Sequence, residues 1–362
     1  MTKIEARNGR NQLFDILKGI GISSIVIGHC FPVADVIRFV YGYHLALFFF
    51  VAGLQYNDKK YAEAPYLFVQ KRIQSLWPSW FFYLTFFSLT YNLALRFHLV
   101  PAGYPFSILN LFDHVYSNVL FFGGELLGGA MWFVPMMLVG MVLFAVLMYC
   151  ATRFFYKIRI WVISVGGLAM GALGLKFCMM HKELILHSHS ALVLMPVLVV
   201  GYLLAYYGVN LKRFLKWPVA LLATGFCVYM LAIKDCVIEL AAEEIISPVL
   251  FYPVTFCGIY MVCYGAKWIE KWAPASRFFC FIGRYSFDIM ALHFLAFKLV
   301  DGVYGRLVGD APEIYSKFPC AYPKLWPIYL TLSLVASPWV RIACSKIYGA
   351  VSVRLQKWFG HQ

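Results

Sequence analysis

Charged residues are scarce in this sequence. Asp, Glu, Lys and Arg make up 13% of its 362 residues, whereas an average soluble domain has about 25%. A water-exposed surface cannot be built from so few charges, and the same numbers exclude a disordered chain or a small disulfide scaffold. Apolar and aromatic types (AVILMFWYC) make up 62%, and the mean hydropathy is +0.73. These values indicate that a lipid bilayer surrounds most of the chain.

Motifs of several soluble enzyme classes are also absent. The sequence has no Gly-rich phosphate loop, no GxSxG elbow and no HExxH pair, so no nucleotide, serine-hydrolase or zinc-protease site is indicated. Its 10 cysteines include no CxxC pair and mostly lie in apolar runs, where they serve as small hydrophobic residues and predict no metal site. An external disulfide is the alternative for four of them: Cys30, Cys178, Cys236 and Cys320.

Positive charge exceeds negative charge. The chain has 31 Lys and Arg against 17 Asp and Glu, which gives a net charge of +14. These cations form no basic stripe with interleaved aromatic residues, so binding to nucleic acid is not expected. They form short clusters between apolar runs, as the positive-inside rule describes for membrane proteins.

Ten apolar stretches predict an all-α, polytopic bundle of transmembrane helices, because the alternating pattern of a membrane β-barrel is missing. The predicted spans are about 13–31, 42–57, 76–95, 131–150, 160–178, 190–208, 218–234, 247–265, 285–302 and 325–345. With a cytoplasmic N-terminus, 20 Lys and Arg fall on the cytoplasmic side and 7 on the external side, and four lie within spans. Both termini are therefore predicted to be cytoplasmic. The predicted organisation is a cytoplasmic segment 1–12, a transmembrane domain 13–345 and a cytoplasmic tail 346–362.

One external connection, residues 96–130, is long and partly apolar, and it ends in the Gly-rich stretch 123–129. Two interpretations are open. It forms a re-entrant segment that lines a cavity, or it is a plain flexible loop.

The first predicted span contains three ionisable residues, which are costly in a membrane and usually functional. Asp15 and Lys18 share one helix face, and Lys18 either acts in a site or reaches out to the inner headgroups. His29 follows after eleven residues, or ~16 Å along the helix axis. Lys18 and His29 therefore mark the inner and outer parts of one path.

Two more histidines lie within predicted spans. His44 begins the second span at the depth of His29, so the two can face each other across a polar cavity. His293 lies near the middle of the ninth span and is the third candidate. The alternative for each is a buried histidine that only hydrogen-bonds a backbone carbonyl. His187 and His189 are interpreted as solvated loop residues, since no further metal ligand lies nearby.

The first span resembles a known family. Its sequence FDILKGI, which continues to VIGH at His29, is similar to the motif of the type-three integral-membrane acyltransferases, in their fucose O-acetylase-like branch: a basic residue, ten residues, then a histidine. Four other stretches resemble this family: Tyr43–Gly53 (YHLALFFFVAG), Gln70–Ile73 (QKRI), Met131–Pro135 (MWFVP) and Ile282–Ser286 (IGRYS). Ala46 and Ala52 stand where the family usually has Pro and Ser.

The resemblance implies a membrane O-acyltransferase. Such a protein transfers an acyl group, usually acetyl from cytoplasmic acetyl-CoA, to a hydroxyl of a glycan or lipid-linked sugar. No bound cofactor is expected, since acyl-CoA is a substrate, and the expected location is the bacterial inner membrane among its lipids. A transporter or flippase for a sugar or lipid is the alternative, in which the same buried charges line a permeation route.

The resemblance also gives roles to individual residues. Histidine is a suitable base for an alcohol at neutral pH, so His29 is the expected general base and His44 its partner. Phosphate groups of CoA are expected to bind cations at a cytoplasmic mouth: Lys18, Lys71, Arg72 and Arg284. Further candidates are Asp15, Trp132 and His293.

Overall fold

The structure is a computed structural model that describes residues 11–359 except 235–236, 243 and 246, with only the backbone described at 232, 244 and 344–359. The predicted segment 1–12 therefore lies almost wholly outside the described residues, as do Cys236 and the end of the predicted tail.

Helices make up most of the described chain, with almost no strand, which confirms the all-α class. The α-helices are α1 (Gln12–Cys30), α2 (Ala34–Tyr41), α3 (His44–Leu54), α4 (Asp58–Tyr61), α5 (Pro65–Arg96), α6 (Ile108–Val119), α7 (Phe133–Phe154), α8 (Arg159–Met179), α9 (Ser188–Tyr206), α10 (Leu211–Phe214), α11 (Trp217–Val228), α12 (Pro248–Ile269), α13 (Ala273–Arg284), α14 (Ser286–Val308), α15 (Pro312–Tyr315) and α16 (Trp326–Phe359). Short helical turns are η1 (Leu126–Trp132), η2 (Tyr156–Ile158), η3 (Ile185–His187), η4 (Tyr229–Ile233) and η5 (Pro323–Leu325). The strands β1 (Ile238–Glu239) and β2 (Glu244–Ile245) form one antiparallel hairpin.

Each of the ten predicted spans overlaps a helix. In the described part of the chain, six helical segments are long and apolar enough to cross a membrane: Gln12–Cys30, Ala34–Leu54, Leu126–Phe154, Tyr156–Met179, Ile185–Tyr206 and Pro248–Ile269. A seventh is added if α13 and α14, which meet at a bend of 83°, count as one span. The other three predicted spans overlap α5, α11 and α16. The count of ten and the cytoplasmic termini stay predictions.

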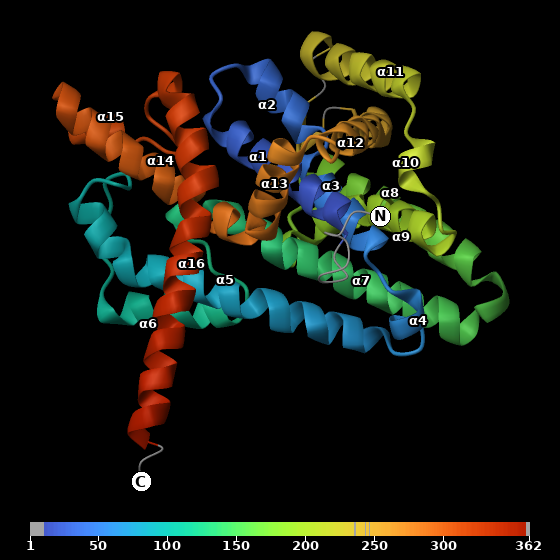
Figure 1. Cartoon of the computed structure of the whole chain (residues 1–362), viewed down its shortest axis with the longest axis horizontal. Coiled ribbons are helices and arrows are strands. Elements are labelled where there is room, and N and C mark those ends of the chain that lie inside the picture. The colour runs from blue at the N-terminus through green and yellow to red at the C-terminus, as the bar shows by residue number, and fades with distance from the viewer. Residues whose placement is uncertain (1–10, 235–236, 243, 246, 360–362) are drawn as a thin grey trace.

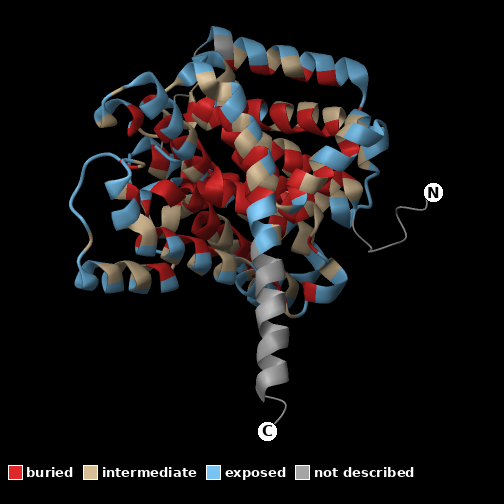
Figure 2. Ribbon diagram, turned by 60° about the vertical axis from the view of Figure 1, so that its left-hand side comes forward, coloured by how far each residue is buried: buried red, intermediate tan, exposed pale blue. Residues whose placement is uncertain are grey.

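Helix α1 lies at the centre of the bundle (Figure 1), where it contacts α2, α3, α12, α13, α14 and α16. Helix α9 packs against α3, α7 and α8, whereas α11 lies at the edge of the bundle beside α12. Buried residues accordingly concentrate in the middle of the molecule (Figure 2). Because α1 is enclosed by other helices, its polar side chains face protein instead of lipid.

Two glycines allow α1 and α13 to cross closely. A Cβ atom at Gly19 would lie 2.3 Å from the carbonyl oxygen of Phe279, and one at Gly283 would lie 1.9 Å from the carbonyl oxygen of Asp15. Both distances are too short for any Cβ atom, so the crossing requires glycine at these positions. It fixes the N-terminal half of α1 against the end of α13, just before the bend into α14.

We expect Gly283→Ala to lower the thermal unfolding temperature of the detergent-purified protein, because a methyl group there forces two backbones apart and overpacking costs about 1–3 kcal/mol. Gly265→Ala on α12 is the matched control, since no neighbouring atom of the described chain lies within 4 Å of a Cβ there. Alanine also favours the helix at that position. Equal unfolding temperatures for the two variants would contradict this account of the crossing.

Candidate functional site

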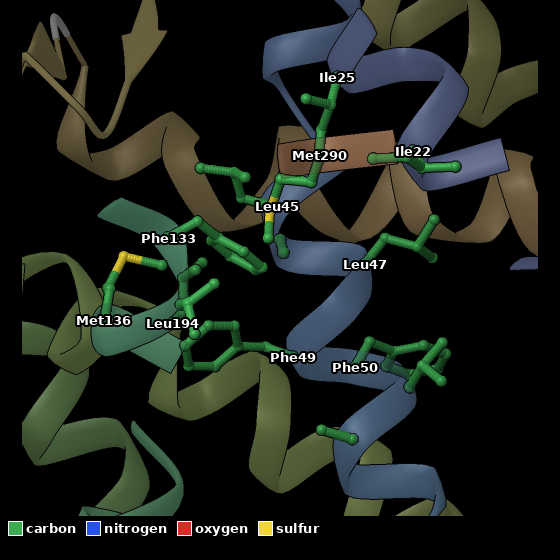
Figure 3. Packing of buried hydrophobic residues seen from close by; sticks show 14 of the residues in the cluster. Ile22, Ile25, Leu45, Leu47, Phe49, Phe50, Phe133, Met136, Leu194 and Met290 are labelled. Atoms are coloured by element: carbon green, nitrogen blue, oxygen red, sulfur yellow. The ribbon is translucent and has the colours of Figure 1, made fainter. Parts of the chain in front are cut away.

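A small cavity lies at the C-terminal end of α1, and we call it the histidine cavity. Its volume is about 50 Å³. Its polar lining comes from His29, Tyr41, His44, Trp132 and Glu239. Its apolar wall includes Ile25, Leu45, Phe133 and Met290, whose side chains converge in Figure 3. The cavity is therefore assembled from α1, the α2–α3 corner, the start of α7, α14 and the β1–β2 hairpin.

His29 lies in the last turn of α1 and is held by aromatic rings. Its imidazole stacks on that of His293, with ring centroids 5.4 Å apart and an interplanar angle of 25°. The rings of Phe294 and Tyr41 meet it edge-on at 4.9 and 6.4 Å. These contacts fix the plane of the imidazole, and the side chain keeps partial access to the cavity.

His44 is the first residue of α3, and its side chain is buried in the cavity wall. Its Nδ1 lies 2.9 Å from the carbonyl oxygen of Val40. A carbonyl oxygen can only accept a hydrogen bond, so Nδ1 carries the proton and the neutral ring keeps its lone pair on Nε2. His44 is thus prepared to take up or relay a proton at Nε2.

His293 is fully buried behind His29 and does not line the histidine cavity. Its Nδ1 lies 2.9 Å from the carbonyl oxygen of Met290, and Nε2 has no hydrogen-bond partner among the described residues. Because His293 has no access to the cavity, its position is that of a residue that orients His29.

The Gly-rich end of the 96–130 connection enters the protein. Residues 126–132 form the short helix η1, in which Leu127, Gly128, Ala130 and Met131 are buried and from which Trp132 reaches the cavity. This segment is helical and runs directly into α7, so it is not a plain flexible loop, and the re-entrant interpretation stays a prediction. The segment is anchored just before η1, where the carboxylate of Glu125 lies 2.7 Å from Nδ1 of His114 and accepts a hydrogen bond from Ser88 at 2.8 Å.

The surroundings of His187 and His189, which were predicted to be solvated loop residues, differ from each other. The ring of His187 lies 4.8 Å from that of Trp132 and so supports the cavity from outside. His189 is fully buried, and its Nδ1 accepts a hydrogen bond of 3.1 Å from the backbone of Leu184. The prediction of a solvated loop was therefore wrong for His189, because α9 begins at Ser188 and draws its first turn into the core.

Glu239 is a cavity residue that sequence reasoning missed. It lies on β1, and the hairpin is fastened to α9 by a 2.9 Å hydrogen bond from Ser190 Oγ to the carbonyl oxygen of Leu240. Glu239 supplies the one carboxylate among the described residues that line the histidine cavity. A lone acid in a loop gave no sequence signal, since only the fold brings it to the histidine cavity.

A second cavity, the basic cavity, lies toward the other end of α1. Its volume is about 530 Å³, and it is lined by Lys18, Gln55, Asn57, Lys60, Tyr61, Lys71 and Arg72. Three of the predicted donor-site cations thus meet in one place, together with Lys60, which was not a predicted site residue. No carboxylate occurs among these described lining residues. Arg72 places its guanidinium 5.0 Å from the ring of Phe68, and its Nε has no hydrogen-bond partner within the described chain.

Arg284, the fourth predicted cation, lies elsewhere. Its Nε is 3.9 Å from a carboxylate oxygen of Asp15 and donates a 3.1 Å hydrogen bond to the carbonyl oxygen of Cys280. Arg284 does not line the basic cavity. Its location at the last turn of α13, beside Asp15 of α1, is that of a residue that ties these two helices together.

A buried ion pair lies in the second half of α14. Lys298 and Asp301 on α14 are fully buried and paired at 2.7 Å. Lys298 also donates to the carbonyl oxygens of Tyr315 and Lys317, and Asp301 accepts from the hydroxyl of Tyr329. This network holds the connection between α14 and α16.

The connection between α14 and α16 also contacts His29, which lines the histidine cavity. Cys320 donates a weak 3.7 Å hydrogen bond from Sγ to the carbonyl oxygen of His29. Cys30 and Cys320 are free thiols, and Cys236 lies outside the described residues, so an external disulfide stays a prediction.

One comparison with known proteins identifies a family. Residues 11–342 match a family model, of type three, that is described as an acyltransferase domain. No curated protein and no solved structure gives a match. The matched region includes every residue that lines the histidine cavity and the basic cavity. The chain therefore belongs to the type-three acyltransferase family of membrane proteins.

Proposed function

We propose that the protein is a membrane O-acyltransferase that moves an acetyl group from cytoplasmic acetyl-CoA to a hydroxyl of a glycan or lipid-linked sugar, in the plasma membrane of a bacterium. One observation carries the proposal. A cavity lined by four cations and a cavity lined by two histidines lie toward opposite ends of the same helix, α1.

The basic cavity suits the phosphate groups of the donor. Lys18, Lys60, Lys71 and Arg72 line it, and no carboxylate occurs among its described lining residues. Charge-assisted hydrogen bonds between such cations and phosphate are among the strongest in proteins. Nε of Arg72, which has no hydrogen-bond partner among the described residues, is one available donor. From Lys18 an extended pantetheine arm has to cover ~16 Å along α1 to reach His29.

The histidine cavity suits the transfer step. His29 removes the proton of the acceptor hydroxyl while the oxygen attacks the thioester carbonyl. The C–S bond then breaks, and the thiolate of CoA leaves and takes up a proton, for which Nε2 of His44 is a relay. Glu239 can accept hydrogen bonds from sugar hydroxyls at the same cavity.

Reconstitution tests this function directly. Purified protein in liposomes receives radiolabelled acetyl-CoA on the cation-rich side and a lipid-linked sugar as acceptor. We expect free CoA to appear only when acceptor is present, together with label on the acceptor. Uptake of the sugar or lipid without release of CoA would instead identify a transporter.

We expect the cations of the basic cavity to set the KM for the donor. Lys18→Met and Arg72→Met should each raise the KM for acetyl-CoA by about tenfold or more, since a hydrogen bond to a charged group contributes ~1.5–3 kcal/mol. Lys18→Arg should keep the wild-type value, and the KM for the acceptor should not change. Lys157→Met is the control, because Lys157 is exposed and does not line this cavity.

A donor KM within about twofold of wild type in both Met variants, an effect below ~0.5 kcal/mol, would show that acetyl-CoA binds elsewhere. In that case Lys18 and Arg72 serve only to place the helices relative to the headgroups.

A further inference from the structure

A third cavity adjoins the basic cavity, and we call it the tyrosine cavity. Its volume is about 460 Å³, and its lining includes Tyr56, Asp58, Tyr202 and Tyr206. It shares Gln55 and Asn57 with the basic cavity. The two cavities therefore lie on either side of the turn that connects α3 to α4.

The tyrosine cavity differs from the basic cavity in its chemistry. Its acid, Asp58, is already satisfied, because it accepts a 2.7 Å hydrogen bond from Arg159 at one carboxylate oxygen and a 2.9 Å hydrogen bond from Tyr202 at the other. The remaining walls are aromatic rings and side-chain amides, with Lys59 at the rim. An uncharged, planar ligand with hydrogen-bonding edges suits such walls better than a phosphate does.

Two tyrosines offer specific contacts to such a ligand. Tyr56 is 5% exposed, yet its hydroxyl has no hydrogen-bond partner in the described part of the chain. Tyr206 is 40% exposed, and the guanidinium of Arg159 lies 5.2 Å from its ring centre. Tyr56 thus has an unused polar group, and Tyr206 has ring surface available for stacking.

The side-chain amide of Asn57 adds polarity at the shared wall. Its Oδ1 accepts a 3.1 Å hydrogen bond from the backbone of Lys60 and caps α4. The NH₂ group of the same amide is left to donate to a ligand. Asn57 therefore connects the two cavities through one side chain.

We propose that the tyrosine cavity binds the adenine base of the acyl donor, while the basic cavity binds the donor's phosphates. This inference rests on the proposed use of acyl-CoA. In CoA the base and the phosphate groups are joined through one ribose, so they must occupy adjoining sites. Tyr206 stacks on the base, and Gln55, Asn57 and the hydroxyl of Tyr56 meet its edge. The pantetheine arm leaves the phosphates in the other direction, along α1.

A truncated donor tests the assignment. We expect Tyr206→Leu to raise the KM for acetyl-CoA roughly five- to 150-fold, the range that stacking of a base on an aromatic side chain provides. The KM for S-acetyl-4′-phosphopantetheine, which lacks adenosine, should stay unchanged. Tyr206→Phe keeps the ring and should behave as wild type. Tyr207→Leu is the control, since Tyr207 is 65% exposed and does not line the cavity.

Binding of adenosine 3′,5′-bisphosphate, measured by calorimetry on the full chain in detergent, supplies a readout that is independent of transfer. We expect Tyr206→Leu to weaken this binding and Tyr206→Phe to preserve it. Equal effects of Tyr206→Leu on both donors, or unchanged nucleotide binding, would overturn the adenine assignment and leave acyl transfer intact. Absence of transfer from either donor in the wild type, with nucleotide binding as expected, would instead refute the proposed function.

Discussion

Replacing His29 by alanine should lower the rate of acyl transfer by a factor of about 10²–10⁴, the usual contribution of a general base. The imidazole is the group at the end of α1 that opens into the histidine cavity, and its plane is fixed by His293 and Phe294. The measurement is the initial rate of CoA release at saturating donor and acceptor. The unfolding temperature of the same preparation shows whether the variant is folded.

The controls separate chemistry from packing. His98→Asn is the matched histidine control, because His98 is exposed and has a φ of 52°, which asparagine tolerates. It should keep the wild-type rate. His29→Gln retains a polar side chain of similar size and should lose as much activity as His29→Ala. A rate within tenfold of wild type in a folded His29 variant would remove His29 from the base role.

His293 gives a different expectation, because it touches His29 and not the cavity. His293→Phe keeps a ring against His29, so it should preserve most of the rate. His293→Ala should lose more, since it leaves a void behind the imidazole. A rate that is close to wild type in His293→Phe and clearly lower in His293→Ala would identify His293 as a positioning residue.

The helices could be predicted because apolar runs and flanking cations are local signals. The predicted spans 13–31 and 190–208 correspond closely to Gln12–Cys30 and Ser188–Tyr206. Depth along one helix also follows from spacing alone, which is why Lys18 and His29 were expected at opposite ends of α1. The meeting of Lys18, Lys71 and Arg72 needed only the additional assumption that neighbouring spans share a cytoplasmic end.

Contacts between distant segments could not be predicted in this way. Glu239 reaches the histidine cavity through a hairpin whose two-residue strands have no recognisable pattern. Arg284 was expected at the donor site, but the 83° bend after α13 brings it to Asp15. The tyrosine cavity combines the turn after α3 with the end of α9, so it depends entirely on helix packing.

The network around Lys298 was not predicted. Lys298 and Asp301 are three residues apart in a predicted span, where two charges of opposite sign are costly unless they pair. The pairing partners Tyr315, Lys317 and Tyr329 come from the following connection and from α16. Their contribution depends on how that connection folds back, for which the sequence has no local signal.

Breaking this buried pair should have the largest effect on stability in the molecule. Lys298→Met leaves the carboxylate of Asp301 buried without its cation, and it removes the donor from two backbone carbonyl groups. Loss of one partner of a buried ion pair costs ~3–5 kcal/mol. We therefore expect a strongly reduced unfolding temperature for Lys298→Met. Lys176→Met should have little effect, because Lys176 is an exposed residue of α8.

The double variant Lys298→Met, Asp301→Leu distinguishes the pair from simple packing. Once both charges are gone, no ion stays buried, and such replacements are often close to neutral. The double variant should thus be more stable than Lys298→Met alone, although Tyr329 and the carbonyl groups of Tyr315 and Lys317 lose their partners. A double variant less stable than either single variant would show that each side chain contributes through packing alone. Because the same connection carries Cys320 to the carbonyl oxygen of His29, Lys298→Met should also lower transfer activity at temperatures where the bundle is still folded.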